Sequence, residues 1–94
     1  MPPMIPVIVT TEFRGVFFGD IEENDEGDAS IRVHSVRNAI YWKGSRGFLG
    51  LASHGPAEDS TIGSTAPEVL LHGVTSVSRC TDAAARVWRE WPEP

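Results

Sequence analysis

The chain has 94 residues, 40% of them hydrophobic, which suits one domain with one core and is too short for two. No apolar run approaches the ~20 residues of a membrane-spanning helix, and residues 1–10 carry three prolines and no basic start, which excludes a typical secretory signal. A single cysteine, Cys80, excludes an internal disulfide and a paired-cysteine zinc motif. We therefore expect one cytoplasmic domain over residues 1–94, with no membrane partner and a flexible N-terminus over residues 1–5.

The charges are unevenly distributed along the chain, whose net charge is −5. Six acids lie within residues 20–28, and none lies within residues 29–57, which hold half of the cations. This pattern predicts an acidic lobe and a basic lobe. The negative total disfavours indiscriminate coating of nucleic acid, because that mode of binding requires clustered lysine and arginine.

The first half of the chain predicts three strands. Residues 6–11 are β-branched and follow a proline, and residues 16–23 form a second apolar run in which Gly19 marks a bend or bulge, so we expect a hairpin. Residues 24–28 have the composition of a turn. Residues 30–42 alternate until the phase slips near Ser35, which predicts a long third strand bent by a bulge.

The second half predicts two helices and two further strands. Residues 47–53 suit a short helix ended by Gly55, with a short strand as the alternative. Residues 57–67 are small and polar, which predicts a surface loop able to act as a lid. Residues 68–80 alternate as strands do, with His72 and Gly73 at a turn or bulge between them. Residues 82–91 follow the N-cap candidate Thr81 and repeat apolar side chains at helical spacing, which predicts an amphipathic C-terminal helix.

Together these elements predict a mainly β, α+β fold. About five strands would form a small bent antiparallel sheet or an open barrel, since bulges and glycines allow a sheet to curve. The C-terminal helix would pack its tryptophan-bearing face on that sheet. Packing would hold the domain together, with a partner subunit as additional support.

Residues 37–56 combine aromatic rings, glycines and cations without an acid. Aromatic rings can stack on a flat ligand, glycines let the backbone approach it, and cations bind phosphate oxygens. The pattern predicts a site for a phosphate-bearing ligand, and its candidate contacts are Arg37, Tyr41, Lys43, Arg46, Gly47 and His54. The alternative is that the aromatics are core residues, and we assign Trp42 and Phe48 to the core or a subunit interface.

The sequence contains no recognisable catalytic or metal-binding pattern. Neither a dinucleotide-binding nor a phosphate-loop glycine pattern occurs, and His34, His54 and His72 lack the spacing of a metal site. Cys80 precedes the predicted C-terminal helix, whose dipole could activate the thiol, but no base accompanies it and we expect a buried structural cysteine. We expect no enzymatic activity, cofactor or metal.

The segments Gly19-Asp20-Ile21, Ser30-Ile31-Arg32-Val33 and His72-Gly73-Val74 resemble the strand pattern of Sm-like small barrels, which assemble into rings and bind RNA. The resemblance implies an open barrel and a homo-oligomer. Ser30 and His72 stand where that family carries the asparagine and the arginine of its motifs. The resemblance therefore implies the barrel more than it implies RNA binding.

The order Tyr41-Trp42, Gly50-Leu51-Ala52, Gly55-Pro56, Gly73-Val74 and Cys80-Thr81 is similar to that of a family of small phage and prophage proteins. This resemblance implies an accessory protein that acts in the cytoplasm of a bacterial host. Our leading hypothesis is a non-enzymatic homo-oligomer that binds and sequesters a nucleotide-like molecule, such as a cyclic nucleotide or an ADP-ribose-type immune signal. The alternatives are an Sm-like RNA-binding protein and a module that binds virion or host proteins.

Overall fold

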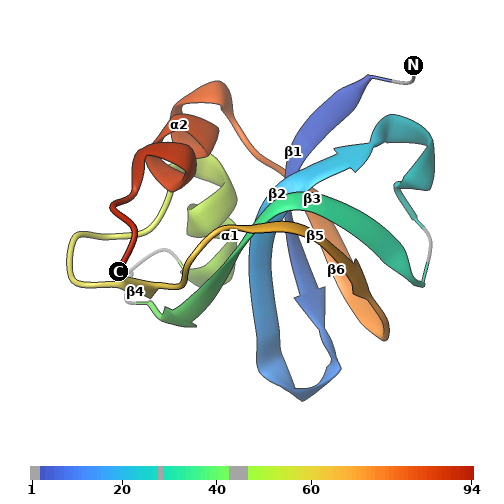
Figure 1. Cartoon of the computed structure of the whole chain (residues 1–94), viewed down its shortest axis with the longest axis horizontal. Coiled ribbons are helices and arrows are strands. Elements are labelled where there is room, and N and C mark those ends of the chain that lie inside the picture. Colours follow the sequence, from blue (N-terminus) through green and yellow to red (C-terminus); the bar gives the residue numbers. More distant parts are fainter. Residues whose placement is uncertain (1–2, 28, 43–46) are drawn as a thin grey trace.

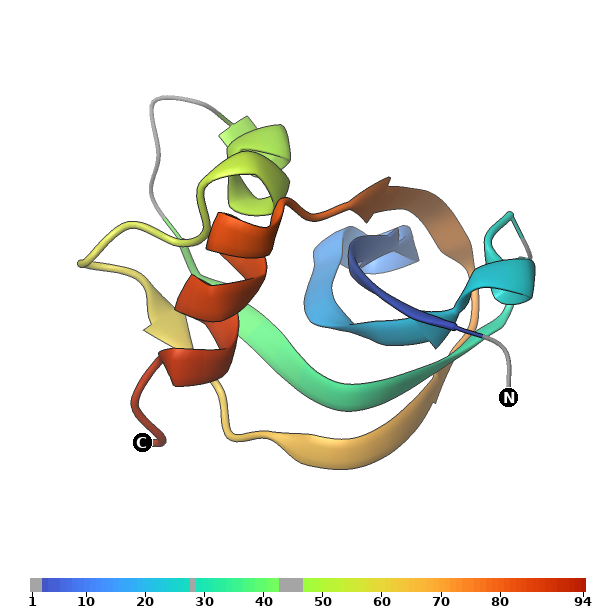
Figure 2. The same ribbon diagram turned by 90° about the horizontal axis from the view of Figure 1, so that it is seen from above.

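The computed structural model describes residues 3–27, 29–42 and 47–94, which form a curved antiparallel sheet with two α-helices beside it (Figure 1). The elements are β1 (Met4–Thr11), the 3₁₀ helix η1 (Glu12–Arg14), β2 (Gly15–Glu22), the 3₁₀ helix η2 (Glu23–Asp25), β3 (Ile31–Tyr41), α1 (Gly47–Ser53), β4 (Thr61–Ile62), β5 (Ala66–Leu71), β6 (Val74–Arg79) and α2 (Asp82–Glu90). Seen from above, the strands curl into an open barrel and both α-helices stand on one side of it (Figure 2). The predicted mainly β fold with a C-terminal helix is confirmed. No helix in the described ranges is long and apolar enough to cross a membrane.

The first two strands form the predicted hairpin. β1 pairs with β2 from Met4 opposite Glu22 to the closing pair at the tip, and η1 makes the turn. Thr81 caps α2 as predicted, because its side chain accepts a hydrogen bond from the Ala84 N–H. Met4 and Ile5 already belong to β1, so the flexible N-terminus predicted over residues 1–5 does not include them.

A bulge bends β3 where the sequence predicts it. Asp20 pairs with His34, but Phe18 pairs with Arg37, so β3 has one residue more than β2 across this interval. Ser35 adopts a left-handed conformation with φ 52°. Gly19 lies opposite, where a Cβ atom would come within 2.2 Å of the Val33 side chain, so only glycine fits. The bulge reverses which face of the sheet the following side chains occupy.

The strand order is β4-β3-β2-β1-β6, and β5 pairs with the same edge of β3 as β4 does. The turn at His72 and Gly73 carries the chain from β5 on one edge to β6 on the other, with Gly73 at φ 65°. The Glu12 N–H donates to the Gly73 carbonyl, which ties the hairpin tip to this turn. Among the described strands no pairing joins β5 to β6, so the barrel stays open there.

Both faces of the sheet are buried, in two separate clusters. The alternation of β1 sends Val7 and Val9 to one face and Ile8 to the other. The concave cluster consists of Val7, Val9, Ile21, Ile31, Val33, Val36 and Leu71. The helix-side cluster consists of Ile8, Val16, Phe18, Ala39, Leu51, Ala52, Ile62, Ala85 and Trp88.

The loop predicted over residues 57–67 is too broad, because β4 lies within it and β5 begins at Ala66. Ile62 is buried in the helix-side cluster, and the Gly63 N–H donates to the Asn38 carbonyl at 2.8 Å. The middle of this segment is therefore attached to β3. This attachment argues against a lid that swings as one piece.

Candidate binding surface

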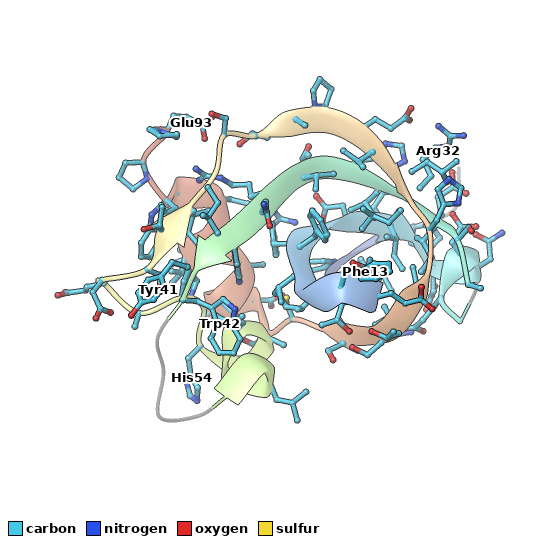
Figure 3. The ribbon with its side chains drawn as sticks, turned by 90° about the horizontal axis from the view of Figure 1, so that it is seen from below. Phe13, Arg32, Tyr41, Trp42, His54 and Glu93 are labelled. Atoms are coloured by element: carbon cyan, nitrogen blue, oxygen red, sulfur yellow. The ribbon has the colours of Figure 1, made fainter. Side chains whose placement is uncertain are left out.

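The structure places Tyr41, Trp42, Gly47 and His54 around the junction of β3 and α1. Tyr41 ends β3, Gly47 begins α1, and His54 follows α1 directly. Tyr41 is 50% exposed and His54 is exposed, whereas Trp42 is half-buried and packs against the helix-side cluster. Figure 3 shows the side chains of Tyr41, Trp42 and His54 on the same side of the molecule, beside α1. These three side chains are called the Tyr41 surface below.

Two of the predicted ligand contacts, Lys43 and Arg46, lie outside the described residues. The Phe48 side chain, predicted to be core or interface, lies outside them too. The Trp42 prediction agrees with the packing of that ring against the helix-side cluster. The Tyr41 surface is therefore the part of the predicted site whose geometry can be described.

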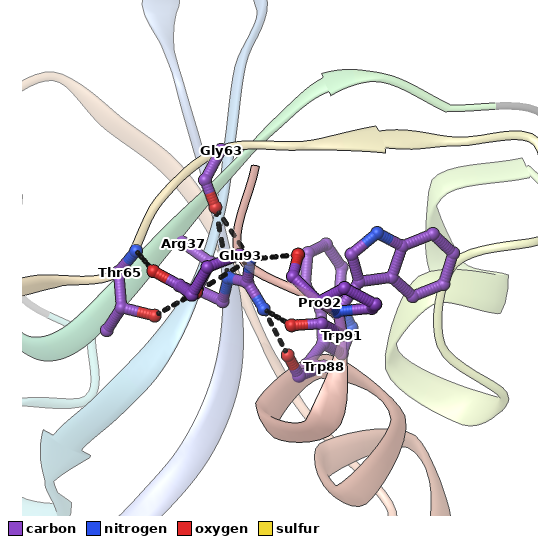
Figure 4. Close-up of polar contacts among 7 residues, drawn as sticks. All are labelled: Arg37, Gly63, Thr65, Trp88, Trp91, Pro92 and Glu93. Carbon is purple, nitrogen blue, oxygen red and sulfur yellow. Dashed lines mark hydrogen bonds and ion pairs between the residues drawn. The ribbon is translucent and has the colours of Figure 1, made fainter.

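Arg37 lies elsewhere, because the bulge in β3 turns it toward the end of α2. Its side chain is 2% exposed and forms an ion pair with Glu93 at 3.0 Å. The guanidinium also donates to backbone carbonyls at 2.5–3.2 Å, which belong to Gly63, Trp88, Trp91 and Pro92 (Figure 4). A guanidinium has five N–H groups, and these acceptors occupy all of them. Arg37 therefore leaves the set of candidate ligand contacts and fixes the C-terminus of α2 to the sheet.

Glu93 completes this arrangement from the exposed side. Its carboxylate accepts hydrogen bonds at 3.0 Å from the Thr65 N–H and from the Thr65 hydroxyl. The backbone hydrogen bond from Thr65, with the charge of Arg37 as a further cause, holds the pKa of Glu93 below its ordinary value. The segment after β4 and the C-terminal segment are thus joined through one side chain.

The fold brings the acids and cations of the sequence together. Arg79 pairs with Glu26 at 2.8 Å, and Arg89 pairs with Asp20 at 2.6 Å, so the C-terminal half supplies counter-charges to the acidic segment. The hydrogen bond from Arg79 lowers the pKa of Glu26. Arg32 pairs with Glu68 at 2.9 Å. Arginines of the C-terminal half therefore neutralise part of the predicted acidic lobe, and Arg32 of the predicted basic lobe is paired with Glu68.

Open hollows lie on two parts of the described chain away from the Tyr41 surface. The first, of about 470 Å³, lies on the outer face of α2 beside Arg86 and Arg89. The second, of about 370 Å³, lies between β6 and the segment of residues 26–29. The described residues contain no group of three or more His, Cys, Asp or Glu side chains placed to hold a metal ion.

Cys80 precedes α2 but is unsuited to nucleophilic chemistry. The thiol is half-buried beside the helix-side cluster, and burial raises its pKa to about 12. The charge of Asp20 raises the pKa further, while Arg89 opposes the shift. Burial therefore outweighs any lowering of the pKa by the start of α2.

We predict that native Cys80 reacts slowly with thiol reagents. At pH 8 a thiol with a pKa near 12 is almost entirely protonated, and only the thiolate reacts. Reaction with Ellman's reagent should be slower in the folded chain than in urea by a factor on the order of 10²–10³. Equal rates in both states, under conditions where circular dichroism shows the native chain folded, would contradict the prediction.

A family model for a domain of unknown function, DUF6948, matches residues 4–88. The match covers the described strands β1 to β6, the three residues of the Tyr41 surface, and α2 as far as Trp88. No curated protein and no solved structure matches the chain.

Proposed function

Because the chain belongs to the DUF6948 family, a domain of unknown function, we propose a function from its own residues: it is a non-catalytic binding protein. Its ligand is a phosphate-bearing, nucleotide-like small molecule that contacts the Tyr41 surface. The observation that carries the proposal is the half-exposed ring of Tyr41 at the end of β3, on the same side of the molecule as the exposed His54. Both residues belong to the stretch of residues 29–57, in which no acid occurs.

The chemistry of this stretch suits a flat anionic ligand. An exposed aromatic ring can stack on a base, and a stacked base contributes about 1–3 kcal/mol. Lys43 and Arg46 follow Tyr41 within five residues of sequence and supply the charge that phosphate oxygens require. The partly buried thiol of Cys80, whose pKa is raised, supports binding rather than catalysis.

The biological setting is part of the proposal. The similarity to small phage and prophage proteins supports an accessory protein that sequesters a signal of bacterial immunity, such as a cyclic nucleotide or an ADP-ribose derivative. A homo-oligomer suits this role, because a second copy would enclose a ligand that a single exposed ring leaves open to solvent.

The test replaces Tyr41 by alanine and measures binding of a panel of cyclic nucleotides and ADP-ribose derivatives by calorimetry. The wild-type chain is expected to bind at least one of them, and Tyr41→Ala is expected to weaken that binding by about tenfold or more, because the stacking ring is lost. Leu70→Ala is the control, since Leu70 is also exposed but lies on β5. Absence of binding across the panel, or equal binding by Tyr41→Ala, would overturn the proposal.

A protein-interaction module is the second candidate. Ile40 at the end of β3 and Leu49 in α1 are both largely exposed, and exposed apolar side chains often mark protein interfaces. RNA binding has less support, because Arg32, Arg79 and Arg89 are each paired with an acid. Salt-dependent retention of short oligonucleotides would identify RNA binding, and a virion or host protein that is released by Ile40→Ser would identify the module.

A further inference from the structure

The carboxylate of Glu93 lies among donors that other parts of the chain supply. Its Oε1 atom accepts from the Thr65 N–H, and its Oε2 atom accepts from the Thr65 hydroxyl and pairs with Arg37 Nη2, each at 3.0 Å (Figure 4). A guanidinium and a backbone N–H form charge-assisted hydrogen bonds with carboxylate and phosphate oxygens alike. These donors of Arg37 and Thr65 are called the oxyanion receptor below.

The oxyanion receptor is fixed by the sheet. Arg37 lies in β3 with its side chain 2% exposed, and its guanidinium also donates to the carbonyls of Gly63 and Trp88. The Gly63 N–H donates to the Asn38 carbonyl, and Thr65 directly precedes β5. Donors that other contacts already hold in place lose little further freedom when they bind an anion. The receptor is therefore formed in advance of any ligand.

The group that occupies the receptor is held less firmly than the receptor itself. Glu93 follows α2 in a segment without helix or strand, and its side chain is 56% exposed. An ion pair with an exposed partner adds little net stability, because water competes for the exposed charge. The match to the DUF6948 family covers residues 4–88, so it includes Arg37 and Thr65 but not Glu93. The receptor belongs to the family domain, and its occupant lies outside the matched residues.

We propose that the oxyanion receptor binds a phosphate or carboxylate group of a ligand, and that Glu93 is its internal competitor. The buried guanidinium of Arg37 requires a counter-charge, because an uncompensated charge inside a protein is costly. A ligand oxyanion supplies that charge when Glu93 leaves, and it enters from the exposed side that the Glu93 carboxylate now occupies. The bonds from Arg37 to the Gly63 and Trp88 carbonyls do not involve the Glu93 segment, so they remain in both states.

This site does not depend on the ligand proposed for the Tyr41 surface. The receptor faces the end of α2, whereas the Tyr41 surface lies beside α1. A chain that fails to bind nucleotides at Tyr41 can still bind an oxyanion at Arg37 and Thr65. The two proposals can therefore fail separately.

Titration of the full chain with inorganic phosphate at constant ionic strength, followed by the amide resonance of Thr65 in NMR spectra, tests the site. In Glu93→Ala the resonance is expected to shift saturably, because phosphate replaces the missing carboxylate. In the wild-type chain the same shift is expected at about tenfold higher phosphate, since the tethered carboxylate competes at an effective concentration on the order of millimolar. The proposal is overturned if Glu93→Ala shows no saturable shift. It is also overturned if the wild-type resonance stays fixed at about fifty times the midpoint concentration of Glu93→Ala.

Two further variants show whether the phosphate binds at the receptor. Glu90→Ala is the matched control, because it removes an exposed acid from the end of α2 and should respond as the wild-type chain does. Arg37→Met combined with Glu93→Ala should lose the shift. If that chain does not fold, Thr65→Val combined with Glu93→Ala, which lacks the hydroxyl donor, should bind several-fold more weakly than Glu93→Ala. Equal binding by the folded double variant and by Glu93→Ala overturns the proposal.

Acetate is titrated in the same way, because the receptor suits a carboxylate as well as a phosphate. Saturable binding of either anion by Glu93→Ala supports the proposal, and the tighter anion identifies the chemical group of the ligand. If neither anion binds, the proposal is overturned.

Discussion

Replacement of Arg37 by methionine is expected to lower the free energy of unfolding by about 3 kcal/mol. Methionine fills similar space but donates no hydrogen bond, so the carbonyls at the end of α2 and the Gly63 carbonyl lose their charged donor. Domains of this size are stable by about 5–15 kcal/mol, so the loss is a large share of the total. Urea unfolding followed by circular dichroism measures it.

Arg32→Met is the matched control for this change. Arg32 also pairs with an acid, but its side chain and that of Glu68 are both exposed, so the expected loss is within about 0.5 kcal/mol. Arg37→Lys should lie between wild type and Arg37→Met, because an ammonium offers three donors where the guanidinium offers five. A loss for Arg37→Met no greater than that for Arg32→Met would show that water replaces the missing donors.

The position of Arg37 shows what the sequence could predict and what it could not. The slip in alternation near Ser35, within residues 30–42, was enough to predict the bulge, because it is a local signal. Which residue would satisfy the last carbonyls of α2 depends on packing between segments 51–55 residues apart. A helix that ends at tryptophan and proline without a glycine cap does signal that some donor is needed there.

Other parts of the fold could not be predicted from the sequence, because they too depend on contacts between distant segments. β4 is two residues long and depends on Ile62 entering a cluster built by distant elements, so no periodicity marks it. The pairing of Arg79 with Glu26 spans 53 positions, and that of Arg89 with Asp20 spans 69. Local charge counts therefore could not predict that arginines of the C-terminal half neutralise part of the acidic segment.

The candidate site was predicted in part. The sequence analysis placed Tyr41 and His54 in one predicted site, with a short helix between them. Both residues are exposed in the structure. Arg37 belongs to the same stretch, but its side chain is buried against the end of α2.

Replacement of Trp88 by alanine is expected to lower the free energy of unfolding by about 4 kcal/mol. Trp88 is 0% exposed and stacks on Phe18, with the ring centroids 5.3 Å apart. Its Nε1–H donates to the Leu51 carbonyl at 3.0 Å. One side chain therefore joins α2 to β2 and to α1, and its removal opens a cavity among three elements. Urea unfolding measures the loss. If Trp88→Ala does not fold, the milder variant Trp88→Phe is measured instead.

Trp88→Phe separates the two roles of this ring. Phenylalanine retains an aromatic partner for Phe18 but leaves the buried Leu51 carbonyl without its donor, so a loss of about 1–2 kcal/mol is expected. Trp91→Ala is the control, since the Trp91 side chain is only half-buried and its carbonyl, which Arg37 uses, remains. If Trp88→Ala lowered the free energy of unfolding by no more than Trp91→Ala does, the helix-side cluster would not depend on the Trp88 ring. A loss two or more times larger would place the main attachment of α2 at Trp88, with Arg37 fixing only its end.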